Sequence, residues 1–174
     1  MRLTMIVLAA AMLAAPALAQ KTDHEAPACT AMDMRLPVGL GDWNGKAAIS
    51  TAPSPEHAVH APLTLGKGYE ASLAKKAEVT FSVPPEKPGG SVSFSGLFAF
   101  TVETEGDYTV ALGMAAWIDV LEDGKALEPS TFGHGLTCTT IRKMVVFAMK
   151  PGVHVLQVAG NGADTLRVMV ARKP

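Results

Sequence analysis

The sequence predicts an all-β protein, an antiparallel β-sandwich or barrel that follows an irregular N-terminal arm. From residue 63 onward, short runs rich in Val, Phe, Thr and Tyr alternate with clusters of Gly, Pro, Asp and Asn. This texture is typical of strands joined by turns. The chain shows no long amphipathic helix and no repeat of fixed period. Many short strands with closely spaced turns favour a sandwich or barrel.

The first 19 residues have the three parts of a secretory signal peptide. Arg2 is followed by an apolar run over residues 5–13, and the small residues of Ala17-Leu18-Ala19 precede Gln20. The run is too short to span a membrane as a helix, which needs about 20 apolar residues. We therefore expect cleavage after Ala19, export to the periplasm or the cell exterior, and no membrane span in the mature chain.

Length, charge and cysteine content narrow the class of protein. Removing 19 of the 174 residues leaves 155, the size of one domain. The 15 Lys and Arg residues nearly balance 16 Asp and Glu, and they are spread along the chain, so we expect neither nucleic acid nor an anionic membrane surface as a partner. Two cysteines in an oxidising compartment predict a disulfide from Cys29 to Cys138 that fastens the arm. A free thiol pair or a shared metal is the alternative.

The arm is expected over residues 20–62 and the sandwich over residues 63–174. The arm is rich in Pro, Ala, Gly and His and has no sustained period, with one short strand expected at Lys46–Ser50. The strands expected in the sandwich are Tyr69–Leu73, Ala77–Val83, Ser91–Val102, Gly106–Met114, Ala116–Leu121, Arg142–Met149, Val153–Val158 and Thr165–Ala171.

Alternation and turn residues support these strands. Tyr108, Val110 and Leu112 fall on one face of their strand, as a half-buried strand requires. Asp123-Gly124, Pro151-Gly152 and Gly160-Asn161-Gly162 supply the residues that tight turns favour. The sequence therefore predicts three successive hairpins.

A set of motifs in the last 75 or so residues resembles a known architecture. The motifs are Phe98–Val102, Gly106–Leu112, Trp117–Val120, Asp123-Gly124-Lys125 and Lys150–Leu156. Their order resembles the jelly-roll sandwiches of the protective-antigen and carbohydrate-binding-module type. The resemblance implies a jelly roll and glycan binding. The acidic calcium loop common in the protective-antigen type, often with adjacent aspartates, has no match in this sequence.

The chain also resembles a group of short exported bacterial proteins labelled homogentisate dioxygenase. That resemblance implies iron, which a ring-cleaving enzyme would hold with histidines and a carboxylate on a cupin scaffold. No His-x-His followed by Glu at cupin spacing occurs in this sequence.

Two groups of residues are candidate metal ligands. His57 and His60 stand three apart beside Glu56, and on a helical turn the two imidazoles would share a face suited to Zn²⁺ or Cu²⁺. The alternative is a solvated loop, because prolines bracket the pair. A second, softer set suits Cu(I) and requires an unbridged cysteine. It comprises His24, Cys29, Met32 and Met34.

Catalytic arrangements are weak by comparison. His134 precedes Cys138 in a glycine-rich loop, where an imidazole can generate a nucleophilic thiolate. Asp119 and Glu122 form the one candidate carboxylate pair, although a strand position and a turn position favour structural roles. The chain has no Gly-x-Ser-x-Gly, phosphate-binding glycine loop or His-Glu-x-x-His. Together these observations favour a non-enzymatic protein, and we predict no cofactor beyond an unidentified metal.

The remaining candidates are contacts to a ligand. Trp43, Trp117 and His134 are the residues best suited to touch a glycan or a partner. The alternatives are that Trp43 seals the arm against the sandwich and that Trp117 is core. The leading hypothesis is an exported, non-enzymatic envelope module that binds a glycan or an envelope protein through its loops. The rival is a metal-binding protein or metal-dependent enzyme using His57, His60 or His134. A third reading is a structural protein whose sheet edge pairs with another subunit.

Overall fold

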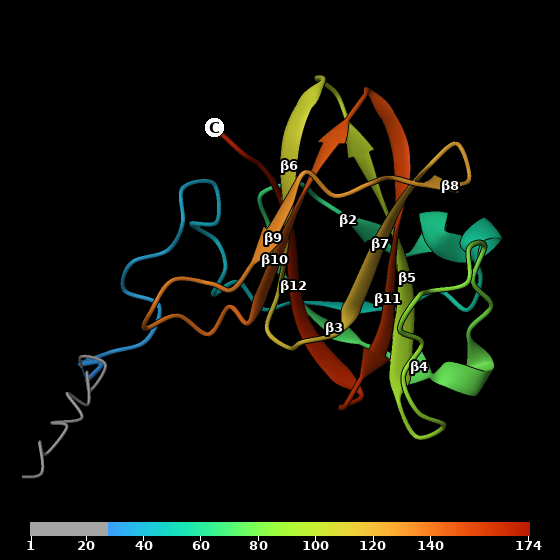
Figure 1. The fold of residues 1–174 in the computed structure, drawn as a ribbon, viewed down its shortest axis with the longest axis horizontal. Coiled ribbons are helices and arrows are strands. Elements are labelled where there is room, and N and C mark those ends of the chain that lie inside the picture. Colours follow the sequence, from blue (N-terminus) through green and yellow to red (C-terminus); the bar gives the residue numbers. More distant parts are fainter. Residues whose placement is uncertain (1–27) are drawn as a thin grey trace, which may run out of the picture.

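Two β-sheets face each other in the computed structural model, which describes residues 28–174 (Figure 1). The expected signal peptide at residues 1–19 lies outside the described residues. One sheet, here called sheet A, contains, in spatial order, β1 (Ala47–Ser50), β3 (Gly68–Ser72), β12 (Thr165–Arg172), β6 (Gly106–Leu112), β10 (Lys143–Met149) and β9 (Thr131–Gly133). Sheet B contains β2 (Pro62–Leu63), β5 (Phe94–Val102), β11 (Gly152–Asn161), β7 (Trp117–Glu122) and β8 (Lys125–Ala126), and β4 (Ala74–Lys75) also pairs with β5.

The strand order is that of a jelly roll, as the resemblance implied. Sheet A has the central order β3-β12-β6-β10 and sheet B has β5-β11-β7-β8. Counted along the chain from β3, the first of these eight strands lies beside the last, and the second lies beside the seventh. This nesting of two Greek keys defines the fold. The sheets are not purely antiparallel, because β1 pairs with β3 and β2 pairs with β5 in parallel.

The sandwich begins earlier in the chain than expected. The short strand predicted at Lys46–Ser50 is present as β1, and residues 55–60 form a 3₁₀ helix, η1 (Pro55–His60). The chain then enters sheet B as β2. The described part of the arm thus contributes a strand to each sheet, and only its residues 28–46 precede the first strand.

The prediction of a strand at Ala77–Val83 is wrong, because no strand forms there. A short 3₁₀ helix, η2 (Lys76–Glu78), is followed by an irregular segment whose backbone donors do not enter a ladder. The N–H of Thr80 bonds to the carbonyl of Pro53, and the N–H of Ser82 bonds to the side chain of Gln157. The apolar side chains that suggested a strand instead pack as a cover on sheet B, with Val79 buried. The other expected strands are confirmed with shifts of a few residues at their ends.

One of the three expected hairpins is confirmed. Asp123 and Gly124 have φ values of 50° and 75° and join β7 to β8, which pair directly. The turn at Pro151-Gly152 instead carries the chain from sheet A to sheet B, and the turn after β11 carries it back. Turn residues specify a chain reversal, but the partner of each strand is set by how the two sheets stack.

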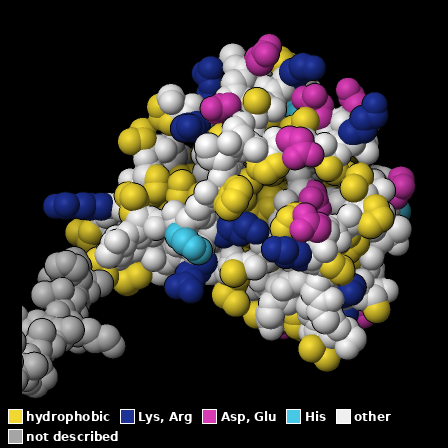
Figure 2. All heavy atoms as spheres, in the orientation of Figure 1, with side chains coloured by type: hydrophobic (Ala, Val, Ile, Leu, Met, Phe, Trp, Pro, Cys, Tyr) yellow, Lys and Arg dark blue, Asp and Glu magenta, His cyan; other side chains and the backbone are white. Residues whose placement is uncertain are grey.

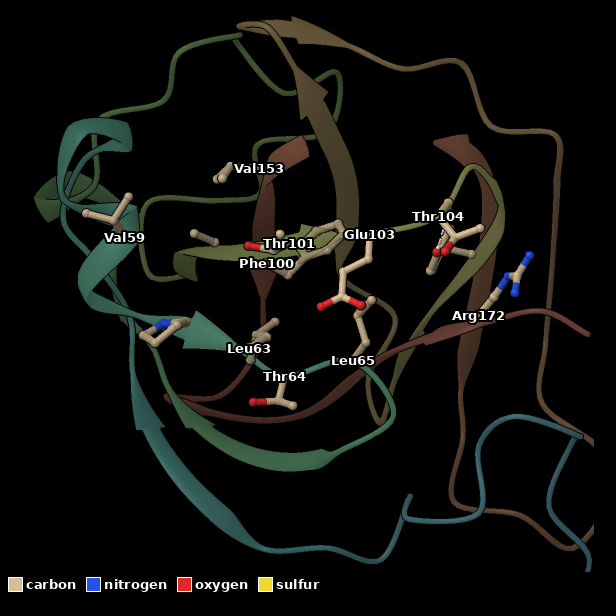
Figure 3. Close-up of a pocket in the computed structure, with 13 residues that line it drawn as sticks. Val59, Leu63, Thr64, Leu65, Phe100, Thr101, Glu103, Thr104, Val153 and Arg172 are labelled. Carbon is tan, nitrogen blue, oxygen red and sulfur yellow. Dashed lines mark hydrogen bonds between the residues drawn. The ribbon is translucent and has the colours of Figure 1, made fainter. Parts of the chain in front are cut away.

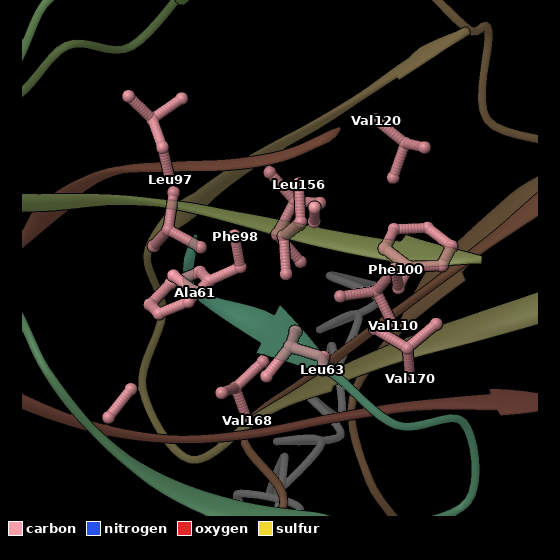
Figure 4. Close-up of a cluster of buried hydrophobic side chains, with 14 of the residues drawn as sticks. Ala61, Leu63, Leu97, Phe98, Phe100, Val110, Val120, Leu156, Val168 and Val170 are labelled. Carbon is pink, nitrogen blue, oxygen red and sulfur yellow. The ribbon is translucent and has the colours of Figure 1, made fainter. Parts of the chain in front are cut away.

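The core lies between the sheets and extends beyond them. Figure 4 shows side chains from both inner faces, among them Phe98, Leu156 and Val168, meeting in one cluster. A second cluster lies on the outer face of sheet A, where Leu40 and Trp43 of the arm cover Met169. The outer face of sheet B is covered in part by η1 and by the segment after η2. Both faces of the central strands are thus buried.

Candidate ligand-binding cleft

The structure gives the two tryptophans different roles. The side chain of Trp43 is completely buried, and its Nε1 donates a hydrogen bond to Thr140 Oγ1 at 2.8 Å. It seals the arm against sheet A and presents no face to a ligand. Trp117 is only partly buried at the start of β7, and its Nε1 donates to Asp119 Oδ1 at 2.9 Å. Of the two indoles, only that of Trp117 borders solvent.

The two cysteines form the predicted disulfide. Cys29 and Cys138 are bonded, with their Cα atoms 5.4 Å apart, and the described residues include no free cysteine. Cys138 therefore has no thiol that His134 could activate. His134 itself is exposed, and one ring nitrogen, Nδ1, lies 3.1 Å from the carbonyl oxygen of Arg142.

The candidate metal ligands do not converge. His57 and His60 lie on η1 with ring centroids 6.4 Å apart, and both are exposed. The Oγ of Ser54 donates to Glu56 and lies 2.9 Å from Nδ1 of His57. Within residues 28–174, no three His, Cys, Asp or Glu side chains gather in a way that could hold a metal ion. The donors described do not fit the iron that the dioxygenase resemblance implied.

The residues of the softer copper set also do not form a metal site among the described residues. Cys29 is committed to its disulfide, and Met32 and Met34 are 50% and 78% exposed. His24 lies outside the described residues. The two residues of the candidate carboxylate pair have different partners. Asp119 accepts a hydrogen bond from Trp117, whereas Glu122 lies 3.2 Å from His154.

A cleft of about 630 Å³ lies at the edge of sheet B. One wall is the segment from β2 into the loop before β3, and the other is the end of β5 with the loop before β6. Its apolar lining includes Leu63, Leu65 and Phe100. A volume of this size lies within the range of small-molecule sites, about 300–1,000 Å³.

Two buried tyrosines fix the loops that form the cleft. The hydroxyl of Tyr108 donates to the carbonyl of Thr104 at 2.6 Å, and the hydroxyl of Tyr69 accepts from the N–H of Thr64 at 3.0 Å. Both tyrosine side chains are at least nine-tenths buried. These two hydrogen bonds hold each loop from inside the sandwich, and loops held in this way lower the entropic cost of binding a ligand.

Polar groups stand around the apolar lining. Figure 3 shows Glu103 lying between Leu65 and Phe100 in the cleft, with Arg172 further along. Neither Glu103 nor Arg172 forms an ion pair with another described residue. The hydroxyls of three exposed threonines complete the rim at positions Thr64, Thr101 and Thr104. The cleft therefore combines an apolar surface with uncommitted donors and acceptors.

Sequence reasoning did not find this cleft. Glu103 and Thr104 follow the expected strand Ser91–Val102, where polar residues indicate only a turn, and Tyr108 was interpreted as core. The available signal was a pair of tyrosines, Tyr69 and Tyr108, at the starts of expected strands. A buried tyrosine needs a partner for its hydroxyl, so each was placed to hold a nearby loop.

Comparison with protein-family models and with curated proteins finds no match. The charged side chains on the face drawn in Figure 2 are interspersed, with basic and acidic groups side by side. No helix among residues 28–174 is long and apolar enough to cross a membrane.

Proposed function

We propose that this protein is an exported, non-enzymatic module that binds a glycan in the cleft beside β5. The observation that carries the proposal is an unpaired carboxylate, Glu103, above an apolar lining whose loops are held by two buried tyrosines. A sugar offers hydroxyls that donate to a carboxylate and accept from threonine and arginine, together with C–H faces that pack on apolar side chains.

The site of action follows from the sequence and from the disulfide. A chain with the predicted signal peptide at residues 1–19 reaches the periplasm or the exterior, where the bond between Cys29 and Cys138 persists. Mass spectrometry of the protein isolated from the envelope and the medium tests this part. A mature chain beginning at Gln20 is expected, and a cytoplasmic chain that retains residue 1 would contradict it.

Glycan-array screening followed by calorimetry tests the binding. Glu103→Ala should weaken binding of a captured glycan by tenfold or more, because a hydrogen bond to a charged group contributes about 1.5–3 kcal/mol. Glu105→Ala is the matched control, since Glu105 lies in the same loop but does not line the cleft, and it should change affinity less than twofold. Absence of any glycan ligand, equal losses in both variants, or turnover of the bound glycan would overturn the proposal.

A further inference from the structure

We propose that Lys87, Lys143 and Trp117 form a second site, which binds an oxyanion group of the carboxylate, phosphate or sulfate class. The site lies at the other end of β11 from the cleft. Val153 borders the cleft and Ala159 borders the second site, and the six residue steps between them along β11 span about 20 Å. The two sites can therefore be tested independently.

The pocket is small, and its walls leave space for a ligand beside the ammonium groups of Lys87 and Lys143. Its volume is about 250 Å³, and apart from Trp117 and the two lysines it is lined only by glycine and alanine. These are Gly89, Ala115, Ala159 and Gly160. Short side chains leave space for a compact anion, or for the acidic group of a larger ligand that projects outward.

Lys143 is held in place without a counter-ion. Its Nζ donates to the carbonyl of Ala116 at 2.8 Å and lies 5.3 Å from the centre of the Trp117 ring. Burial and then repulsion from Lys87 lower the pKa of Lys143, and Asp119 opposes this shift. Two N–H groups of the ammonium remain for a ligand, because an ammonium has three donors.

Lys87 is brought to the same ring by a close contact between its loop and the end of β11. Its Nζ lies 5.4 Å from the centre of the Trp117 ring. The neighbouring Gly89 packs on Gly160 at the end of β11, and a Cβ on Gly89 would lie 2.5 Å from the Cα of Gly160. Both glycines have positive φ, at 74° and 70°. A side chain on Gly89 would push the loop that carries Lys87 away from the sheet, and one on Gly160 would meet the same loop at 3.2 Å, so glycine at both positions permits the close approach.

The acidic groups nearby do not neutralise the pair. Asp119 accepts from the indole Nε1, and neither Lys87 nor Lys143 has a carboxylate oxygen within 4.0 Å among the described residues. Burial raises the pKa of Asp119 and the charge of Glu86 adds to the rise, whereas hydrogen bonds from Trp117 and Gln157 and the charge of Lys143 lower it. An anion placed between the two ammonium groups would relieve their mutual repulsion and gain charge-assisted hydrogen bonds.

Titration followed by ¹H–¹⁵N NMR tests the site on the full mature chain. Sodium phosphate, sodium sulfate and sodium glucuronate are the probes, each at ionic strength held constant with sodium chloride. We expect saturable shifts of the Gly89 and Gly160 amides and of the Trp117 indole N–H with at least one probe. Tighter binding of glucuronate indicates an acidic sugar, and tighter binding of phosphate or sulfate indicates an inorganic or ester group. Both results support the site.

Variants assign the binding to the two lysines. Lys87→Gln and Lys143→Gln should each weaken the affinity at least threefold, and the double variant should abolish saturation. Lys125→Gln on β8 is the control, because Lys125 is exposed and does not line the pocket. Lys87 is also exposed, so its variant is expected to fold, and thermal unfolding of the variant checks this. Lack of saturation with all three probes, or unchanged affinity in the double variant, would overturn the proposal, whatever the result for Glu103.

Discussion

The indole of Trp43 donates a hydrogen bond to Thr140 Oγ1 at 2.8 Å, across a sequence separation of 97 residues. Thr140 in turn donates its hydroxyl and its backbone N–H to the two carboxylate oxygens of Asp33, each at 2.6 Å. The guanidinium of Arg167 lies over the Trp43 ring at 5.8 Å from its centre. These contacts, together with the disulfide, bind the arm to the outer face of sheet A.

Truncating Trp43 should therefore cost more than any other change in the arm. We expect Trp43→Ala to lower the free energy of unfolding by about 3–5 kcal/mol, the range for large aromatic side chains in a core. Trp43→Phe keeps most of the packing and loses the hydrogen bond, so about 1 kcal/mol is expected. Urea denaturation measures both. Met34→Ala, at a side chain 78% exposed, is the control and should stay within about 0.5 kcal/mol. Equal effects of Trp43→Ala and Met34→Ala would contradict the seal.

The disulfide should contribute independently of that seal. Cys29 and Cys138 lie 109 positions apart in the sequence, and removing such a bridge typically lowers stability by about 2–4 kcal/mol. The double variant Cys29→Ala/Cys138→Ala should show this loss in urea denaturation. Thiol titration of the unfolded, non-reduced wild type should find no reactive thiol. Two thiols per chain in that titration would refute the bridge.

Periodicity and turn chemistry were enough to predict most of the sandwich. The alternation of Tyr108, Val110 and Leu112 correctly marked the inner face of β6, and Asp123-Gly124 correctly marked a hairpin. The expectation of export predicted the bridge between Cys29 and Cys138, because an oxidising compartment lets two thiols form a lasting disulfide. These signals are local in sequence or depend on the compartment alone.

Features that depend on long-range packing were not predictable from the sequence. The segment containing Val79 has the alternating pattern of a strand, but an irregular chain can also bury every second residue. Its apolar side chains cover sheet B without forming a strand. The candidate cleft joins Leu65, Glu103 and Arg172, which no local spacing relates. Trp117 stays a predicted ligand contact, and the two lysines beside it come from β10 and from the loop before β5, which no local spacing relates to it.

Glu122 and His154 predict an acid-sensitive contribution to stability. Glu122 Oε1 accepts from the backbone N–H of Lys150 at 3.1 Å and lies 3.2 Å from Nε2 of the buried His154. The Lys150 hydrogen bond, followed by that of His154, holds the pKa of Glu122 below its ordinary value of 4.5. A lowered carboxyl pKa stabilises the folded state above the unfolded value, and this gain is lost as pH falls through the folded pKa.

Glu122→Gln should accordingly reduce stability at pH 7 and reduce it less at pH 3. Urea denaturation of wild type and variant between pH 3 and pH 7 measures the difference. Glu128→Gln, at an exposed position after β8, provides the baseline and should show no pH-dependent difference from wild type. A loss for Glu122→Gln that is the same at pH 3 and pH 7 would show that the carboxylate charge is not its source.

The close approach of Gly89 to Gly160 predicts different outcomes for two adjacent glycines. Gly89 has a φ of 74°, and an added Cβ would meet the Cα of Gly160 at 2.5 Å and Ser93 Oγ at 2.6 Å. Gly90 has no atom within 4 Å of such a Cβ. Gly89→Ala should therefore destabilise the protein by more than about 1 kcal/mol, whereas Gly90→Ala should leave stability within about 0.5 kcal/mol or raise it slightly.

The same pair of variants links the loop to the second site. If Gly89 positions Lys87 over Trp117, Gly89→Ala should weaken binding of the anion probe in the NMR titration at temperatures where the variant is fully folded. Gly90→Ala should bind as the wild type does. Because both changes add one methyl group to the same loop, a difference between them reports the contact with β11. Equal affinity in the two variants would show that Lys87 reaches the ring without that contact.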